Sequence, residues 1–198
     1  MKEKILKALE GINKAKNLME LNLVNKEFSY DTDGRNNTQK GVYDICNNYV
    51  DFTYQFIIPY QYEIENMNSS DFYLDKIKPF LKKYTTKYFS AICKEYLEVQ
   101  NQLGKLPIHF ERIGKWIGKA GLIDFVAQDE KGNTMLGLCN WEKPMMRYND
   151  YEWLLFCADQ ARLKPDYIYL FSAKAFDEKL KFAETSKKNI KLLTLDNL

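Results

Sequence analysis

Three cations that could contact phosphate groups lie close together in the middle of the chain. Arg112, Lys115 and Lys119 fall within one short stretch, and proteins that bind nucleic acid neutralise phosphates with such side chains. The same three charges beside a strand would also fit the solvated face of an ordinary domain. The net charge of +2 is too small to indicate a polyanionic partner by itself. Both interpretations of this cluster therefore stay open.

The same stretch contains a segment with a superficial likeness to a nucleotide-binding loop, Gly114-Lys115-Trp116-Ile117-Gly118-Lys119-Ala120. A phosphate-binding loop has the pattern GxxxxGK[ST], in which the final hydroxyl holds Mg²⁺. Here the glycine spacing is shorter and Ala120 has no hydroxyl. We interpret the segment as a loop between two strands, where glycines permit positive φ, and expect no nucleotide binding.

The sequence carries no signature of a zinc site or of a catalytic nucleophile. The cysteines are widely spaced without a CxxC pair, and His109 is the single histidine. Four cysteines could still converge in the fold, but reduced and buried thiols are the simpler expectation. We expect no cofactor. The cysteines are Cys46, Cys93, Cys139 and Cys157.

Aromatic residues make up 15% of the chain, and nine of the 14 tyrosines fall between Tyr43 and Tyr96. The remaining composition is globular, with 45% hydrophobic and 28% charged residues. The tyrosines predict aromatic core packing. The alternative is a surface that stacks on nucleic-acid bases or on a partner protein. No signal sequence or membrane-spanning run is recognisable, so we expect a cytoplasmic protein that does not enter a membrane.

Hydrophobic periodicity divides the chain into residues 1–83 and residues 84–198. The first part predicts a partial winged-helix-like and helical segment, whose latter half is rich in aromatic residues. Its expected elements are a helix over 3–21, strands at 23–30 and 42–45 around a polar loop over 31–40, an aromatic stretch over 47–66, and a short helix over 75–83 that Pro79 limits.

The second part predicts an α/β domain with a mixed sheet flanked by helices. The expected elements are a helix over 84–103, strands near 107–112, 122–128 and 134–141, a helix over 150–163, a strand over 166–171, a helix over 174–186 and a strand over 190–195. A helix followed by three antiparallel strands, and then by alternating helices and strands, is the core of restriction-endonuclease-like folds.

Two stretches carry a resemblance to a known family. The first runs from Gly41 to Asn47 and on through Phe52-Thr53-Tyr54-Gln55-Phe56-Ile57-Ile58-Pro59. The second includes Ile113-Gly114-Lys115-Trp116, Ile123-Asp124-Phe125-Val126-Ala127 and Gly137-Leu138-Cys139-Asn140-Trp141. Together they resemble DUF234, a domain of the PD-(D/E)xK nuclease type at the C-terminal end of archaeal and bacterial AAA-type ATPases. The resemblance implies a restriction-endonuclease-like fold after a winged-helix segment.

The resemblance also implies that the catalytic residues have largely been lost. Such nucleases hold a divalent metal with carboxylates from two strands and a helix, and a lysine stabilises the charge that develops. Asp124 matches the first acid. Leu138, Asn140 and Ser90 stand at the positions of the second acid, the lysine and the helix glutamate. Asp124 is then either a vestigial metal ligand or a strand-end carboxylate satisfied by backbone donors.

These residues lead us to expect a catalytically degenerate nuclease-like protein that binds double-stranded DNA or acts as a regulatory partner. One alternative is an active nuclease that uses Mg²⁺ or Mn²⁺ with relocated residues such as Glu111, Glu142 or Lys143. Adjacent residues on a strand point to opposite faces, so this alternative requires unusual local geometry. The other is a protein–protein interaction module for a separate ATPase, which would use the aromatic segment 43–62 and leave an apolar patch exposed there.

Overall fold

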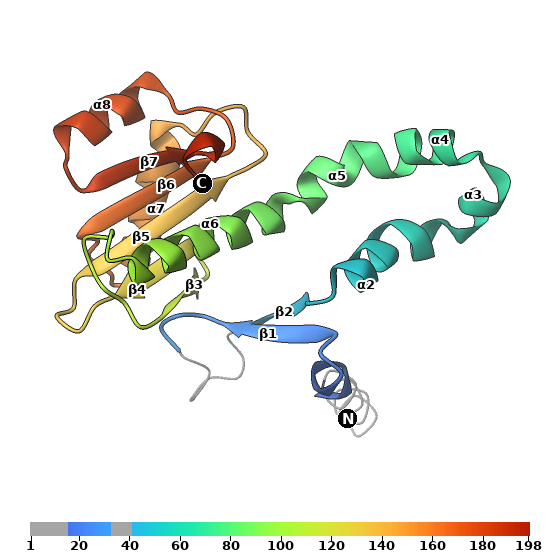
Figure 1. The fold of residues 1–198 in the computed structure, drawn as a ribbon, viewed down its shortest axis with the longest axis horizontal. Helices are drawn as coiled ribbons and strands as arrows, with labels where there is room; N and C mark the ends of the chain where they lie inside the picture. The colour runs from blue at the N-terminus through green and yellow to red at the C-terminus, as the bar shows by residue number, and fades with distance from the viewer. Residues whose placement is uncertain (1–15, 33–40) are drawn as a thin grey trace. The chain divides into compact units, whose positions relative to one another are not determined.

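The computed structural model describes residues 16–32 and 41–198, which form two compact units (Figure 1). Among the described residues, the first unit runs to Phe28 and from Gly41 to Phe80. The second consists of the segment that begins at Ser29 and of Leu81–Leu198. Most of the predicted helix over 3–21 and of the predicted loop over 31–40 lies outside the described residues. Of that helix, residues 16–20 are described and are helical.

A five-stranded mixed sheet forms the centre of the second unit, in the order β3-β4-β5-β6-β7. Its strands are β3 (Ile113–Ile117), β4 (Leu122–Gln128), β5 (Thr134–Asn140), β6 (Tyr167–Ser172) and β7 (Ile190–Thr194). The first three are antiparallel neighbours, whereas β6 and β7 join in parallel. Together with the helices described below, this confirms the predicted α/β fold with a mixed sheet flanked by helices.

Helices cover both faces of this sheet (Figure 1). Helix α6 (Thr86–Gln102) packs on one face, where its Phe89 and Leu97 share a core cluster with Phe125 of β4. Helices α7 (Tyr148–Gln160) and α8 (Glu178–Ser186) pack on the other face, where Leu154 and Leu180 share a second cluster. Parallel strands connected by right-handed crossovers place their helices on one face, which accounts for α7 and α8 lying together.

The predicted strand over 107–112 is wrong, and the predicted loop over 114–120 is right only for residues 118–120, since residues 114–117 belong to the strand. The strand is Ile113–Ile117, and the turn that follows is closed by a hydrogen bond from Gly118 N to Gly121 O of 3.0 Å. The backbone of Phe110, before the strand, is hydrogen-bonded instead to the side chain of Asn101. The amide of Asn101 donates to Phe110 O at 2.8 Å and accepts from Phe110 N at 3.1 Å. The backbone here thus pairs with α6 rather than with a strand.

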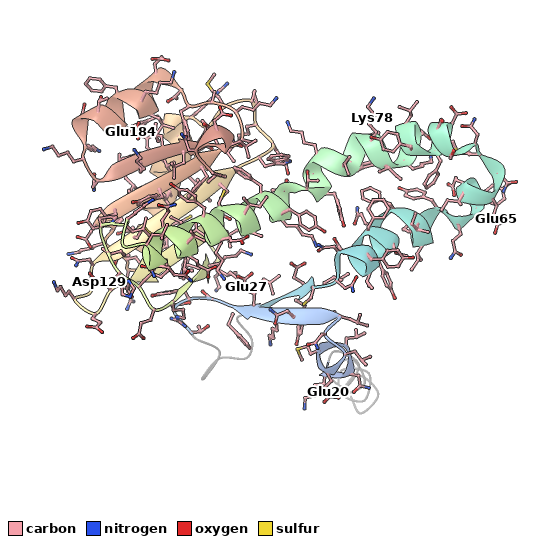
Figure 2. All side chains as sticks on the ribbon, viewed as in Figure 1. Glu20, Glu27, Glu65, Lys78, Asp129 and Glu184 are labelled. Atoms are coloured by element: carbon pink, nitrogen blue, oxygen red, sulfur yellow. The ribbon has the colours of Figure 1, made fainter. Side chains whose placement is uncertain are left out.

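At the β7 edge of the sheet, the outward-facing backbone amides donate hydrogen bonds to other groups of the same chain. Three of its amides donate outside the ladder with β6: Ile190 to Lys187 O, Leu192 to Glu184 Oε1 and Thr194 to Asn197 Oδ1. Glu184 reaches this edge from α8, on which it is labelled (Figure 2). An edge whose amides are already satisfied is a poor template for another strand.

The β3 edge is covered by the segment that follows strand β1. Tyr30 N donates to Lys115 O at 2.7 Å, and Ile117 N donates to Ser29 Oγ at 3.0 Å. Ser29 is fully buried by this contact. Both outer strands of the sheet therefore find hydrogen-bond partners within the second unit.

The first unit contains an antiparallel strand pair and a helical hairpin. Strands β1 (Val24–Phe28) and β2 (Gly41–Ile45) pair from Val24 opposite Ile45 to Phe28 opposite Gly41, which confirms the two predicted strands. The hairpin consists of α2 (Asn48–Phe52), the π-helical turn η1 (Thr53–Ile57), the 3₁₀ turn η2 (Ile58–Tyr60) and α3 (Gln61–Asn66), followed by α4 (Ser69–Phe72), the π-helical turn η3 (Tyr73–Ile77) and α5 (Lys78–Tyr84).

Side chains and prolines explain where these short helices begin and change pitch. Asn47 accepts hydrogen bonds from the Tyr49 and Val50 amides and so caps α2. Pro59 and Pro79 each follow shortly after a π-helical turn. A proline lacks an N–H and crowds the carbonyl one turn back, and a wider turn relieves that clash. The expectation that Pro79 limits a helix over 75–83 is therefore wrong, because Pro79 lies in the first turn of α5.

Among the residues that the structure describes, we find no helix with both the length and the apolar character needed to span a bilayer.

We predict that Asn101→Ala lowers the free energy of unfolding by roughly 2–4 kcal/mol. The substitution leaves the buried amide and carbonyl of Phe110 without their partner, so both lose their hydrogen bonds without regaining water. Urea unfolding followed by circular dichroism measures the change. Gln102→Ala, at the neighbouring exposed position of α6, is the matched control and should change stability by less than about 0.5 kcal/mol. Equal effects of the two substitutions would contradict this role of Asn101.

Candidate functional site

Asp124, the one acid that matches the nuclease pattern, lies at a β-bulge in β4. The register between β3 and β4 shifts so that Lys115 lies opposite two residues, Asp124 and Phe125. Ile123 and Val126, on either side of the bulge, both pack into the cluster beneath α7 and α8, whereas Phe125 packs beneath α6. A bulge of this kind re-aims side chains, and here it leaves the consecutive residues Asp124 and Phe125 both on the α6 face.

The carboxylate of Asp124 serves the backbone of the neighbouring strand. The ladder between β4 and β5 ends at the pair Phe125 and Gly137. Beyond it, Asp124 Oδ2 accepts a hydrogen bond of 2.8 Å from Cys139 N. A buried amide without an acceptor is unfavourable, so the carboxylate replaces the ladder partner that the bulge removes. This contact agrees with the interpretation of Asp124 as a carboxylate that backbone donors satisfy.

Helix α6 brings Ser90 and Cys93 to the same place. Both side chains hydrogen-bond to the Cys139 thiol, which also lies in the electrostatic field of Asp124. Burial is the largest cause that raises the pKa of Cys139 well above its ordinary value of 9.0, followed by Cys93 and Asp124, while Ser90 lowers it. The structure thus brings together Ser90 and Asp124, two of the four positions of the nuclease pattern, around a neutral thiol.

Leu138 and Asn140, the other two positions, lie elsewhere. Leu138 packs against the cluster beneath α7 and α8, on the opposite face of β5 from Cys139. Asn140 is buried, and its amide donates to Lys143 O at 3.3 Å and to Ser172 Oγ at 3.4 Å. Neither side chain faces Asp124, so the four positions form no shared site.

Of the three residues that might have replaced the lost ones, Glu111 lines a surface cavity, and Glu142 and Lys143 are held in other contacts. Glu142 Oε1 accepts from Thr86 Oγ1 at 3.0 Å. Lys143 Nζ donates to Asp150 Oδ1 at 2.5 Å. Among the described residues, no group of three or more histidine, cysteine, aspartate or glutamate side chains is placed to hold a metal ion.

The three predicted phosphate-contacting cations lie along β3 and its turn. Arg112 precedes the strand, and its guanidinium lies 4.3 Å from the centre of the Tyr30 ring and donates to Tyr30 O at 2.9 Å. Lys115 lies within the strand at the bulge, and Lys119 is exposed in the turn that follows. Arg112 thus helps to hold the segment that covers the β3 edge.

The sequence of this chain matches the model of a known protein family. The family model of DUF234, described as archaeal and bacterial proteins of unknown function, matches residues 53–152. This match covers half of the chain, from the helical hairpin through the three antiparallel strands to the first turn of α7. The chain belongs to the DUF234 family.

One curated relative of this DUF234 protein is the uncharacterized protein MJECL04 of Methanocaldococcus jannaschii. The two are 28% identical over 121 residues, which is 61% of this chain and 26% of the relative. The aligned part of the chain thus spans about a quarter of the relative's length. No solved structure matches the chain.

A surface cavity of the DUF234 chain was not expected from its sequence. It has a volume of about 600 Å³ and is bounded by the covering segment, the stretch before β3 and the turn between β4 and β5, where Figure 2 labels Asp129. Asp129 accepts from the Lys131 and Asn133 amides and from Asn133 Nδ2, and these bonds lower its pKa, the side chain of Asn133 being the largest cause. The lining residues are Tyr30, Pro107, Ile108, His109, Glu111, Arg112, Gln128, Asp129, Glu130 and Lys131.

We predict that Cys46 is the thiol that reacts in the native protein. Cys46 is exposed, whereas Cys93 and Cys157 are buried and Cys139 is partly buried. The thiolate is the reactive form, and burial raises the pKa of both Cys139 and Cys157. Iodoacetamide labelling followed by peptide mass spectrometry should modify Cys46 first and the other three after unfolding. Labelling of Cys139 as fast as Cys46 would contradict this.

Because the pKa of Cys139 is raised, we predict that the free energy of unfolding decreases at alkaline pH. The folded state favours the neutral thiol, so this contribution is complete below the ordinary value of 9.0 and is lost as pH rises above it. Urea midpoints measured across that range should fall on the alkaline side.

Proposed function

We propose that this chain is a catalytically degenerate nuclease-like domain that acts as a regulatory binding partner rather than as an enzyme. One observation carries the proposal. The carboxylate that matches the metal-binding acid accepts the Cys139 amide and is accompanied by Ser90 and Cys93, not by a second carboxylate and a lysine. Metal-dependent phosphodiester cleavage needs at least a bound cation and a charge-stabilising group.

The placement of the degenerate positions supports the same proposal. Leu138 is part of the packing beneath α7 and α8, and Asn140 is buried with hydrogen bonds to Lys143 and Ser172. Leu138 and Asn140 thus contribute to packing and to hydrogen bonds of the fold, at positions where a nuclease would have catalytic side chains. The scaffold is preserved while its chemistry is replaced, which is what a domain kept for binding requires.

The length of the relative supports a partner protein. The shared region makes up 26% of the Methanocaldococcus jannaschii protein, so in that protein it is connected to a much larger remainder. The partner that we propose is an ATPase, because the family resembles domains that are attached to AAA-type ATPases. The exposed tyrosines of the segment 43–62, among them Tyr49 and Tyr62, favour contact with a protein.

A plasmid-nicking assay tests the loss of catalysis. We predict no cleavage above the buffer rate with Mg²⁺ or Mn²⁺, for the natural chain and for Asp124→Asn alike. Asp124→Ala should lower the free energy of unfolding by about 1–3 kcal/mol, since it leaves the Cys139 amide without an acceptor. Asp124→Asn keeps an oxygen that can accept from the Cys139 amide, so this variant should lose less free energy of unfolding. Cleavage by the natural chain that Asp124→Asn abolishes would establish an enzyme and overturn the proposal.

Binding of double-stranded DNA is a second candidate, favoured by the gathering of Arg112, Lys115 and Lys119 along β3 and its turn. We predict that the double variant Lys115→Ala/Lys119→Ala binds a duplex more weakly, with a salt slope lower by about 2. Arg112 stays unchanged because it holds Tyr30. Fluorescence anisotropy at several salt concentrations measures both quantities. Lys164→Ala, an exposed lysine before β6, is the control. Affinity that does not change with salt would count against this candidate.

A further inference from the structure

Two cysteines that are far apart in the sequence meet between α6 and β5. Cys93 lies on α6 and Cys139 on β5, and their thiols are hydrogen-bonded to each other. Both are free thiols; Cys93 is completely buried and Cys139 is partly buried. Other small residues would fill the same space in a core, so what distinguishes a pair of cysteines is the chemistry of their thiols.

The register between α6 and β5 explains why these two thiols meet. One turn before Cys93, the Phe89 ring packs against Trp141 with ring centroids 5.3 Å apart, and Trp141 lies two residues after Cys139. Four residues of a helix rise about 6 Å and two residues of a strand about 6.6 Å, so the two elements stay in step. The next pair along this contact is therefore Cys93 and Cys139.

Small side chains let α6 approach β5 closely around this pair. Ser90 precedes Cys93 on the helix, Gly137 precedes Cys139 on the same face of the strand, and Cα atoms of the two elements come within 8 Å of each other. A disulfide requires Cα atoms about 4.4–6.8 Å apart. Because the two thiols are already in contact, a small movement of the helix toward the strand brings the sulfur atoms to bonding distance.

We propose that Cys93 and Cys139 form a reversible disulfide that ties α6 to β5 when the protein meets a hydroperoxide. The bond lies beside Asp124, whose Oδ2 accepts the Cys139 amide at 2.8 Å. It closes a loop of the chain that contains β3 and β4, and it restricts the unfolded state accordingly. This inference is independent of the proposed function, since it requires neither an ATPase nor DNA.

The oxidation proceeds in two steps. The thiolate sulfur of Cys139, the more accessible of the two, attacks one peroxide oxygen; the O–O bond breaks, one water leaves and Cys139 becomes a sulfenic acid. The Cys93 sulfur then loses its proton and attacks the Cys139 sulfur, so that the S–S bond forms and the S–O bond breaks with release of a second water. Two thiols lose two electrons, and one hydrogen peroxide is reduced to two waters.

The surroundings of Cys139 set the pace of the first step. Burial raises the pKa of Cys139, which keeps the reactive thiolate scarce, whereas the hydrogen bond from Ser90 lowers it. The bridge therefore forms more slowly than an exposed thiol such as Cys46 is oxidised. A slow reaction of this kind records sustained exposure to a hydroperoxide rather than a brief one.

The other two cysteines are placed differently. Cys157 packs in the cluster beneath α7 and α8, on the opposite face of the sheet from Cys139. Cys46 is exposed in the first unit and reacts on its own. Replacing Cys46 by serine therefore removes the competing thiol without touching the pair.

Peptide mapping of the Cys46→Ser chain tests the proposal. The reduced protein is treated with hydrogen peroxide, alkylated, and digested with trypsin without reduction. We expect peptide 88–94 joined to peptide 132–147, with a mass lower by two hydrogen atoms than the sum of the two peptides, and we expect dithiothreitol to separate them. Cys46→Ser/Cys157→Ser is the matched control and should form the same bridge.

Thermal unfolding measures whether the bridge holds α6 on the sheet. We expect the Tm of the oxidised Cys46→Ser chain to be higher by about 5–10 °C than after reduction with dithiothreitol. Cys46→Ser/Cys93→Ser should show no such rise. In that variant the reaction stops at the sulfenic acid of Cys139, which dimedone traps for mass spectrometry.

Three results would overturn the proposal, and all are measured on the Cys46→Ser chain, so that none depends on the folding of a core variant. The first is that Cys93 and Cys139 both stay free at peroxide concentrations that oxidise Cys46 of the natural chain. The second is a bridge from Cys139 to Cys157 as abundant as the one to Cys93. The third is a bridged protein whose Tm is no higher than that of the reduced form.

Discussion

The β-bulge in β4 is the constraint on which the rest of the candidate site depends. Because Lys115 faces two residues, Asp124 and Phe125 share the α6 side of the sheet. Counted from Ile123, alternation puts Asp124 on the α6 side, and the bulge lets Phe125 take the same side. The bulge also ends the ladder with β5 and leaves the Cys139 amide to be satisfied by the Asp124 carboxylate. One inserted residue thus determines which neighbour shares the face of the acid and which amide the acid accepts.

The residues on the two faces of β5 are set by packing and hydrogen bonding within the sheet. Gly137 lies beneath the Phe125 ring, where an added Cβ would come within 2.6 Å of Phe125 Cδ2, so packing alone requires glycine. Cys139 joins the α6 face and Leu138 the opposite one. Each of these positions is filled by what close packing and hydrogen bonding demand. Sheet order and helix layers therefore need no carboxylate at position 138 and no lysine at position 140.

The two units differ in how they are stabilised. The second unit has a buried core on each face of its sheet, and side chains and backbone groups satisfy both of its edge strands. The helical hairpin of the first unit has capped helices, with Asn47 and Asn68 at their starts, but buries few of its apolar side chains. Local hydrogen bonding can form such helices, whereas lasting burial of their surfaces needs further contacts.

Much of the fold could be predicted from the sequence, since alternating strands, the turn at Asp129 and the apolar faces of α6 and α7 are local patterns. What could not be predicted depended on residues distant in sequence. Asn101 captures the backbone of Phe110, so an apolar stretch that reads as a strand is not one. The identities at positions 90, 138 and 140 are by themselves what leads us to propose that the nuclease residues are missing. Only the tertiary structure decided that Asp124 accepts the Cys139 amide, because the bulge depends on the register between two strands and cannot be recognised in either strand alone.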